Sequence, residues 1–360
     1  MNNELKTPLI RLVKREDASK KMIYLTRIAA FVIALILGGL IFLIIKKNPF
    51  TAYATILKGT LGRSSGIRQV IKIATPLLGC ALALAPCFKM RFWNVGAEGQ
   101  ITMGAIFATY FALNWYSRMP RVVLLLAMAL ASMIGGALWA AIPAFFKAKF
   151  NTNETLFTLL MNYIAIGIAG YLVGGPWEGK PGSQIIPMFN PKAVLPKLFG
   201  VQIGWIIVLL LTVFIFVYMN FTKHGYEIAV LGESENTARY AGMNVVKVIV
   251  RTCLLSGAIN GLVGFMMASG THMTLYKDVA GGIGFTAITV CWLSQFNPAA
   301  MIAIALLLAI LERGSSTLQS SLAIPASVSD IITGIILLSM LACEFFITYR
   351  LIFRKKEEQA

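Results

Sequence analysis

The sequence holds few of the residues that usually carry charge or chemistry. Only 13% of its 360 residues are charged, and just 15 are Asp or Glu. This composition excludes an ordinary soluble domain, in which charged residues make up about a quarter of the chain. The two histidines, His224 and His272, lie far apart without metal-ligand spacing, so no metal site is predicted. No nucleophile stands beside a base in the sequence, so no enzyme activity is expected on this chain.

Cysteine is scarce, and its distribution excludes two further kinds of site. The five cysteines form no CxxC pair, and all lie in or beside apolar runs: Cys80, Cys87, Cys253, Cys291 and Cys343. This placement is typical of small buried hydrophobic residues and not of a disulfide framework or a metal site.

Nucleotide-binding motifs are present only in outline. Residues 174–180 fit the letters GxxxxGK, but no strand precedes them, and Pro181 stands where Ser or Thr should hold magnesium. Residues 281–284 open an apolar helix, where close helix packing explains the glycines better than a dinucleotide. The chain is therefore expected to bind no cofactor of its own.

Long apolar segments dominate what is present. Hydrophobic residues make up 58% of the sequence, and its mean hydropathy is +0.75. This predicts an all-α fold, a polytopic membrane helix bundle with about ten transmembrane helices. Several expected spans are shorter than the ~20 residues of a straight crossing, as in segments that line transport pathways. The expected spans are 28–45, 73–88, 101–115, 122–146, 155–173, 202–221, 248–269, 281–293, 298–311 and 331–349.

The basic residues indicate how the bundle is oriented. A net charge of +17 could suggest nucleic acid, but the bases lie mostly between apolar segments, so no nucleic-acid partner is expected. Most Lys and Arg fall on the side of the N-terminus, which predicts that both termini are cytoplasmic. We therefore expect a cytoplasmic segment at 1–27, a transmembrane domain at 28–349 and a cytoplasmic tail at 350–360. The polar leader lacks a small-residue cleavage site, which favours a retained first helix.

A polar turn at residues 92–100 runs directly into an apolar helix. Asn94, Glu98 and Thr102 are four residues apart and would share one helix face, whereas Gln100 would point elsewhere. One interpretation makes Asn94 the N-cap and places Glu98 at the positive end of the helix dipole. The other makes these side chains a polar stripe beside a substrate path.

A second polar stripe lies on the fifth expected span, with Glu154, Thr158 and Asn162 again four residues apart. Glu154 stands at the head of the helix, where a dipole role explains it equally well. The deeper Asn162 suits either an interhelical hydrogen bond or a contact with substrate.

Residues 222–247 form the longest polar stretch inside the apolar part of the chain. Ser234 or Glu235 can begin a short helix, and Gly242 can end it in the left-handed conformation. The stretch is either a solvated loop or a short cytoplasmic helix that docks into a groove of a soluble partner.

These residues carry a resemblance to a known family. Residues 94–100, NVGAEGQ, resemble the "FNIGAEGQ" signature of permease subunits in ABC importers for nucleosides and simple sugars, within the ribose and branched-chain amino-acid permease family. Residues 153–164 resemble the family's "NE…LNYI" helix, and residues 232–242 resemble its "GxNxxAARYAGI" coupling segment. Weaker similarities lie at 281–298 and 324–334. The sequence is bulkier than the pattern at Trp93 and at 291–294.

The resemblance implies a permease subunit, most simply for nucleosides, in the bacterial cytoplasmic membrane. It implies three partners besides the bilayer: a second permease subunit in a heterodimer, ATPase subunits that hold ATP and magnesium, and a substrate-binding lipoprotein or periplasmic protein. The substrate path is expected at Trp93, Asn94, Glu98, Gln100, Thr102, Thr158 and Asn162. ATPase coupling is expected at Gly232, Glu233, Glu235, Asn236, Ala238, Arg239, Tyr240 and Gly242.

Three alternatives stay open at this point. The first is a simple-sugar permease of the same kind. The second is an ion-coupled secondary transporter, which would need ionisable groups deep in its spans, whereas acids such as Glu98, Glu154 and Asp330 fall mainly at span ends. The third is a membrane scaffold, which would not need two polar stripes.

Overall fold

The computed structural model describes residues 10–14, 20–325, 327–328, 331–332, 334–335, 338–339, 342 and 349–353. The chain divides into two compact units: residues 1–59 with 314–360, and residues 60–313. Parts of both expected terminal segments, and Asp330, lie outside the described residues.

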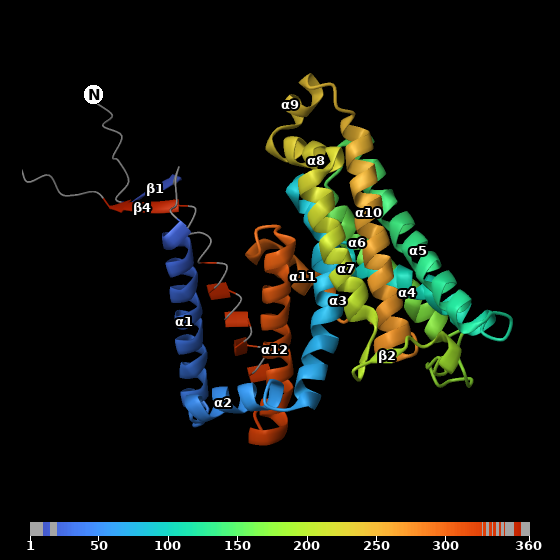
Figure 1. Ribbon diagram of the computed structural model, residues 1–360, viewed down its shortest axis with the longest axis horizontal. Coiled ribbons are helices and arrows are strands. Elements are labelled where there is room, and N and C mark those ends of the chain that lie inside the picture. The colour runs from blue at the N-terminus through green and yellow to red at the C-terminus, as the bar shows by residue number, and fades with distance from the viewer. Residues whose placement is uncertain are drawn as a thin grey trace, which may run out of the picture. The chain divides into compact units, whose positions relative to one another are not determined.

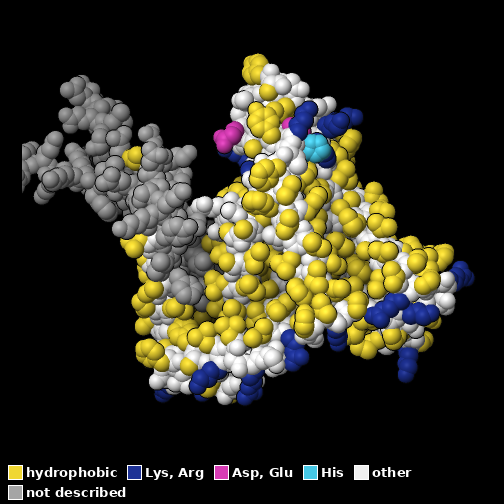
Figure 2. All heavy atoms as spheres, viewed as in Figure 1, with side chains coloured by type: hydrophobic (Ala, Val, Ile, Leu, Met, Phe, Trp, Pro, Cys, Tyr) yellow, Lys and Arg dark blue, Asp and Glu magenta, His cyan; other side chains and the backbone are white. Residues whose placement is uncertain are grey.

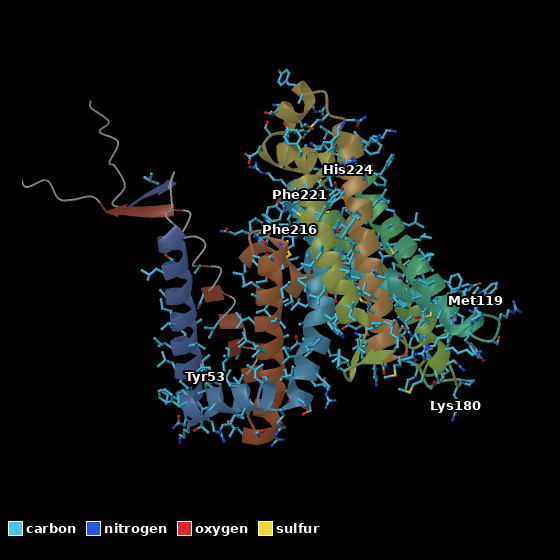
Figure 3. All side chains as sticks on the ribbon, in the orientation of Figure 1. Tyr53, Met119, Lys180, Phe216, Phe221 and His224 are labelled. Carbon is cyan, nitrogen blue, oxygen red and sulfur yellow. The ribbon has the colours of Figure 1, made fainter. Side chains whose placement is uncertain are left out.

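The first unit contains a two-stranded ribbon and a sharply bent helix pair. Strand β1 (Ile10–Lys14) pairs antiparallel with β4 (Tyr349–Phe353). Helix α1 (Lys20–Ile44) is followed by α2 (Pro49–Thr60), and the segments Val32–Ile44 and Pro49–Thr60 meet at 113°. The Tyr53 hydroxyl, labelled in Figure 3, donates a 2.6 Å hydrogen bond to the carbonyl of Leu35 and so ties α2 to α1.

The second unit is a helix bundle (Figure 1), and it contains the two polar stripes and the coupling segment. Its elements are α3 (Ser64–Lys89), α4 (Ala97–Asn114), α5 (Arg121–Phe150), α6 (Glu154–Val173), η1 (Pro191–Ala193), β2 (Lys197–Leu198), β3 (Val201–Gln202), α7 (Gly204–Phe221), α8 (Lys223–Glu233), α9 (Glu235–Tyr240), α10 (Val245–Phe265), the π-helical η2 (Met266–His272), α11 (Ile283–Leu293) and α12 (Pro298–Leu322). Helix α12 continues beyond this unit.

Six described helices are long and apolar enough to cross a membrane, or seven if the bent pair counts as one span. The expectation of a multi-pass helical membrane protein is therefore confirmed. Helix α4, expected as the third span, is not among the six. Its first turn carries Glu98 and Gln100, and most of the helix is buried where it packs against α5, α6 and α10.

The outer helices expose apolar side chains, as a chain solvated by lipid should. On α7, Leu210, Val213 and Phe214 are exposed, and the face over α7 and α10 in Figure 2 is almost entirely hydrophobic. Lys and Arg gather toward the ends of these helices. This pattern agrees with a membrane-embedded bundle whose polar ends reach water.

Small residues let three central helices approach one another closely. A Cβ placed on Gly136 of α5 would lie 2.7 Å from the Cα of Gly261 on α10, and one on Gly104 of α4 would also meet the Gly261 backbone. In a membrane, packing of this kind is a main source of helix association, because lipid is as apolar as the side chains. The crossing of α4, α5 and α10 at Gly261 therefore organises the bundle.

This crossing predicts a contrast between two glycines inside helices. Gly261→Ala would force a methyl group into the Ser132 carbonyl and should lower stability by about 1–3 kcal/mol. Gly167→Ala on α6 meets nothing within 4 Å and should leave stability unchanged or slightly raised. Thermal unfolding of the two purified variants checks this, and equal melting temperatures would contradict the close crossing.

Candidate functional site

The site is built around the turn that joins α3 to α4. Helix α4 begins at Ala97 with Gly96 as its N-cap, so the interpretation that Asn94 caps this helix is wrong. The Asn94 side chain instead accepts a 3.1 Å hydrogen bond from the backbone N–H of Gly96, two residues on, as in an Asx turn. Asn94 therefore precedes the helix and shares no helix face with Glu98 and Thr102.

Asn94 belongs to a buried network of side-chain amides. Its Nδ2 donates to Ser256 Oγ at 3.2 Å, and its Oδ1 accepts from Gln100 Nε2 at 3.1 Å. Asn260 Nδ2 donates to Gln100 Oε1 at 2.8 Å. Gln100, expected to point elsewhere, is thus the partner of Asn94, because the turn redirects Asn94. Ser256 and Asn260 were not predicted, although both are polar residues in the apolar run of α10.

Glu98 holds the start of another helix. Its carboxylate is 2% exposed and accepts hydrogen bonds from the backbone N–H groups of Gly282, at 2.5 Å, and Gly284, at 2.7 Å. Gly282 is the N-cap of α11 and Gly284 lies in its first turn, so Glu98 stabilises the positive end of α11 as well as that of its own helix. The Thr102 hydroxyl donates to the Glu98 carbonyl at 2.8 Å, within α4.

Glycine is required where α11 meets Glu98. Gly281 and Gly282 have φ of +58° and +82°, the left-handed region, and a Cβ on Gly284 would lie 2.5 Å from Glu98 Oε2. The glycines of residues 281–284 therefore let the backbone approach the Glu98 carboxylate and donate hydrogen bonds to it. At Gly284 this agrees with the expectation of close packing.

The second polar stripe clamps the same turn from α6. Asn162 accepts a 2.8 Å hydrogen bond from the N–H of Gly99 and donates a 3.0 Å bond to the carbonyl of Val95. Thr158 Oγ1 accepts from the N–H of Val95 at 3.2 Å, and Glu154 forms a 2.9 Å ion pair with Lys147 of α5. Of the two interpretations of Asn162, the structure supports the interhelical hydrogen bond, because Asn162 joins α6 to Gly99 and Val95.

An aromatic pair forms the exposed part of the site. Trp93 is 42% exposed and stacks on Trp292 of α11, which is 39% exposed, with ring centroids 5.3 Å apart and planes inclined by 16°. Phe88 and Phe296 support the pair at 5.8 Å from Trp93 and 5.2 Å from Trp292. Every other expected path residue is buried to 2% exposure or less. Trp292 was noted only as a bulky departure from the family pattern.

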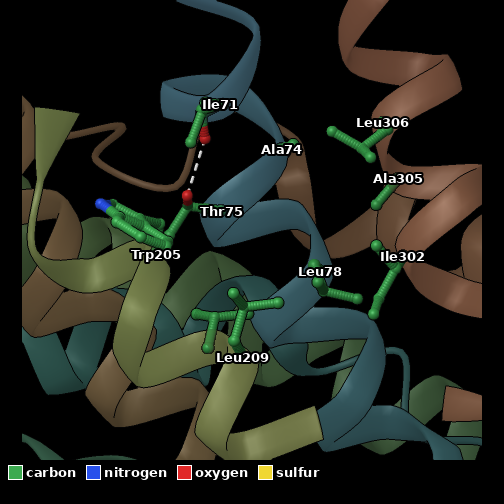
Figure 4. A pocket seen from close by; sticks show the side chains of 10 residues that line it. Ile71, Ala74, Thr75, Leu78, Trp205, Leu209, Ile302, Ala305 and Leu306 are labelled. Atoms are coloured by element: carbon green, nitrogen blue, oxygen red, sulfur yellow. Dashed lines mark hydrogen bonds between the residues drawn. The ribbon is translucent and has the colours of Figure 1, made fainter. Parts of the chain in front are cut away.

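A separate cavity of about 210 Å³ lies between α3, α7 and α12 (Figure 4). Its lining is almost wholly apolar, with Leu78, Leu209 and Ile302 among its walls, and the hydroxyl of Thr75 is occupied by a 2.7 Å bond to the Ile71 carbonyl. This cavity suits a hydrocarbon chain and offers little to a polar solute.

The expected coupling segment folds as two helices. The short helix is confirmed: α9 runs over Glu235–Tyr240, Ser234 caps it by accepting from the Thr237 N–H at 3.3 Å, and Gly242 follows with φ +72°. The expected residues Gly232 and Glu233 lie in α8, whose N-cap, Thr222, was missed. Of the residues expected to contact the ATPase, all but Gly232 and Ala238 are exposed: Glu233, Glu235, Asn236, Arg239, Tyr240 and Gly242.

The coupling segment packs directly against the turn of the site. Ala238 of α9 and Ile228 of α8 share a buried cluster with Met90 and with Phe92, the residue before Trp93. Gly232 abuts the carbonyl of Lys89, so closely that no Cβ could fit there. A displacement of α8 and α9 would therefore press on the residues that position Trp93.

The anchoring of α11 predicts the effect of a nearly isosteric change. Glu98→Gln replaces one acceptor oxygen by a donor, which leaves a buried N–H of Gly282 or Gly284 unpaired and should cost about 1–3 kcal/mol of stability. Asp278→Asn removes an exposed carboxylate whose negative charge repels that of Glu98, so stability should be unchanged or slightly raised. Thermal unfolding compares the two, and equal stability of both variants would contradict the anchoring role.

The chain is similar to several ABC transporter permeases. The chain is 31% identical to the glucose ABC transporter permease protein TsgB13 of Haloferax volcanii over 355 residues, 95% of this chain and 93% of that protein. It is 30% identical to the guanosine ABC transporter permease protein NupP of Bacillus subtilis over 326 residues, 87% and 92% of the two chains. It is 25% identical to the nucleoside ABC transporter permease protein NupB of Lactococcus lactis over 336 residues, 90% and 92%.

Residues 66–341 match the family described as branched-chain amino acid transport system / permease component. This range contains the polar turn, both stripes, α11 and the coupling segment. The chain therefore belongs to this family of ABC transporter permeases, transport subunits that carry no catalytic function.

Proposed function

We propose that this permease subunit of the nucleoside and sugar group forms half of a translocation path whose solute is a nucleoside. The observation that carries the proposal is the exposed stack of Trp93 and Trp292 beside a buried polar scaffold. Large flat aromatic faces stack on nucleobases, and each such contact is worth about 1–3 kcal/mol. The guanosine and nucleoside permeases among its relatives support this choice.

A simple sugar is the second candidate, and one observation favours it. The glucose permease of Haloferax volcanii resembles this chain at 31% identity over nearly its whole length. Sugars also pack their apolar faces on aromatic rings, so the tryptophan pair suits both solutes. The two candidates differ in the contact area they need on the tryptophan rings. A flat nucleobase covers an indole ring more fully than a puckered pyranose does.

The buried polar residues have a positioning role in this proposal. The amide network of Asn94 and Gln100 and the clamp of Asn162 fix the turn, and Glu98 fixes α11. Together they hold Trp93 and Trp292, which come from segments far apart in the sequence, in one stack. Thr102 and Thr158 belong to the same scaffold.

The complete transporter would contain further subunits. The chain would lie in a bacterial cytoplasmic membrane with about ten spans over residues 28–349, and its terminal segments 1–27 and 350–360 would face the cytoplasm. It would pair with a different permease subunit and receive solute from a binding lipoprotein or periplasmic protein. ATP and magnesium would be held by the partner ATPases, which the family membership supports.

Energy would enter through the coupling segment. ATPase closure would displace α8 and α9, and their packing on Met90 and Phe92 would pass the movement to Trp93. Two states of the tryptophan pair, stacked and parted, would then correspond to closed and open paths.

The tryptophan pair predicts a change in solute affinity. Trp292→Ala should raise the KM for guanosine about tenfold, because one stacking face is lost, while the subunit still assembles. Trp115→Ala, at the other end of α4, is the matched control and should transport normally. Uptake of guanosine and of glucose into vesicles that contain the whole transporter measures both. Transport of glucose without guanosine would contradict the proposal that the solute is a nucleoside, but it would leave the assignment as a permease intact.

The coupling segment predicts two defects with different causes. Arg239→Glu reverses an exposed charge that now pairs with Glu235 at 2.7 Å, and it should weaken ATPase binding by about 1–3 kcal/mol if that face is the contact. Gly242→Val strains a residue at φ +72° and should distort the end of α9, whereas the neighbouring Ala241→Val, at φ −77°, should not. Co-purification of the ATPase with each variant decides, and undiminished recovery with both Arg239→Glu and Gly242→Val would contradict the assignment.

A further inference from the structure

A polar pocket lies where α8 and α10 begin, apart from the tryptophan pair. It has a volume of about 360 Å³ and is lined by Lys223, His224, Glu227, Asn244, Lys247 and Arg251. Figure 2 shows Lys and Arg side chains gathered around a histidine at this end of the bundle, and Figure 3 identifies the histidine as His224. None of these residues is among those expected from the family signatures.

The charge of the pocket favours an anion. Three side chains with a fixed positive charge face it, against the single carboxylate of Glu227. Glu227 is engaged by Arg251 through a 2.9 Å ion pair, and among the described residues neither Lys223 nor Lys247 pairs with an acid. The guanidinium of Arg251 also interacts with Tyr218, so Lys223 and Lys247 supply the positive charge of the pocket that no acid among the described residues neutralises.

Two helix dipoles reinforce the same preference. Helix α8 begins at Lys223 and α10 at Val245, so the positive ends of an 11-residue and a 21-residue helix, capped by Thr222 and Asn244, lie beside the pocket. Partial positive charge at helix N-termini favours phosphate groups in particular. The fixed charges and the dipoles therefore act in one direction.

The position of the pocket indicates where the anion comes from. The membrane-spanning helix α7 ends at Phe221, directly before Lys223, and Phe221 is 73% exposed. Its ring lies 6.0 Å from that of Phe216, also exposed, and Figure 3 shows both on the stretch that leads to His224. An aromatic, lipid-facing surface thus continues into a basic pocket at the boundary of the membrane. Basic pockets at such boundaries suit the headgroups of anionic lipids.

We propose that this pocket binds the phosphate group of an anionic membrane lipid, whose acyl chains lie over Phe216 and Phe221. The lipid would bridge the start of α8 to the start of α10, on either side of α9. It would thereby brace the coupling segment from the membrane side. The inference does not depend on which solute the permease carries.

The test is lipid retention by the intact purified permease. The protein is equilibrated in mixed micelles of phosphatidylglycerol and phosphatidylcholine, and native mass spectrometry counts the phosphatidylglycerol that stays bound. The wild type should retain one molecule in preference. Lys223→Gln with Lys247→Gln should lower that retention about 25-fold, because each lysine near the headgroup contributes about fivefold. Lys180→Gln with Lys192→Gln removes the same charge from an exposed loop and should change nothing.

Two further arms make the result specific. Glu227→Gln removes the one acid and should raise retention, which a merely structural role of the pocket would not do. Displacement of the lipid by millimolar glycerol phosphate would assign the site to soluble phosphate esters. Equal retention in the wild type and the Lys223/Lys247 variant would overturn the proposal. Loss of ATPase binding in that variant with lipid retention intact would overturn it too. The pocket would then be part of the ATPase interface.

Discussion

The carboxylate of Glu98 is the group on which the rest of the site depends. It is buried, and among the described residues no Lys or Arg pairs with it. A buried charge is tolerated only where strong donors surround it, and here they are the N–H groups of Gly282 and Gly284 and the positive ends of α4 and α11. Because these donors belong to a helix far along the chain, the charge that needs them also fixes where α11 lies.

The other buried polar groups extend this anchoring in two directions. The amides of Asn94, Gln100 and Asn260 connect the turn to α10, and Asn162 connects it to α6. Toward water, the same turn packs on α8 and α9 through Met90 and Phe92. A single short turn thus lies between an exposed tryptophan pair and the proposed lever. This arrangement suits a transport subunit without catalytic function, in which displacement of α8 and α9 would open or close the translocation path.

Local chemistry made some of this predictable from the sequence. The short helix α9 follows from Ser234 as a cap and Gly242 as a left-handed stop, both decided within a few residues. The stripe of Glu154, Thr158 and Asn162 on α6 was likewise correct, because the helix is regular there. The Asn94 face was wrong, since a turn interrupts the periodicity before Ala97. The bonds from Glu98 to Gly282 and the stack of Trp93 on Trp292 join residues nearly two hundred positions apart, and no local pattern reports them.

Hydrogen–deuterium exchange at the start of α11 tests the central claim most directly. If the Glu98 carboxylate holds this helix, the amides of residues 282–286 exchange slowly in the wild type and much faster in Glu98→Gln. Protection of α10 at its crossing with α5, which Glu98 does not contact, should be unchanged in the same variant. Equal protection of residues 282–286 in the two proteins would contradict the account, because α11 would then owe its position to packing alone.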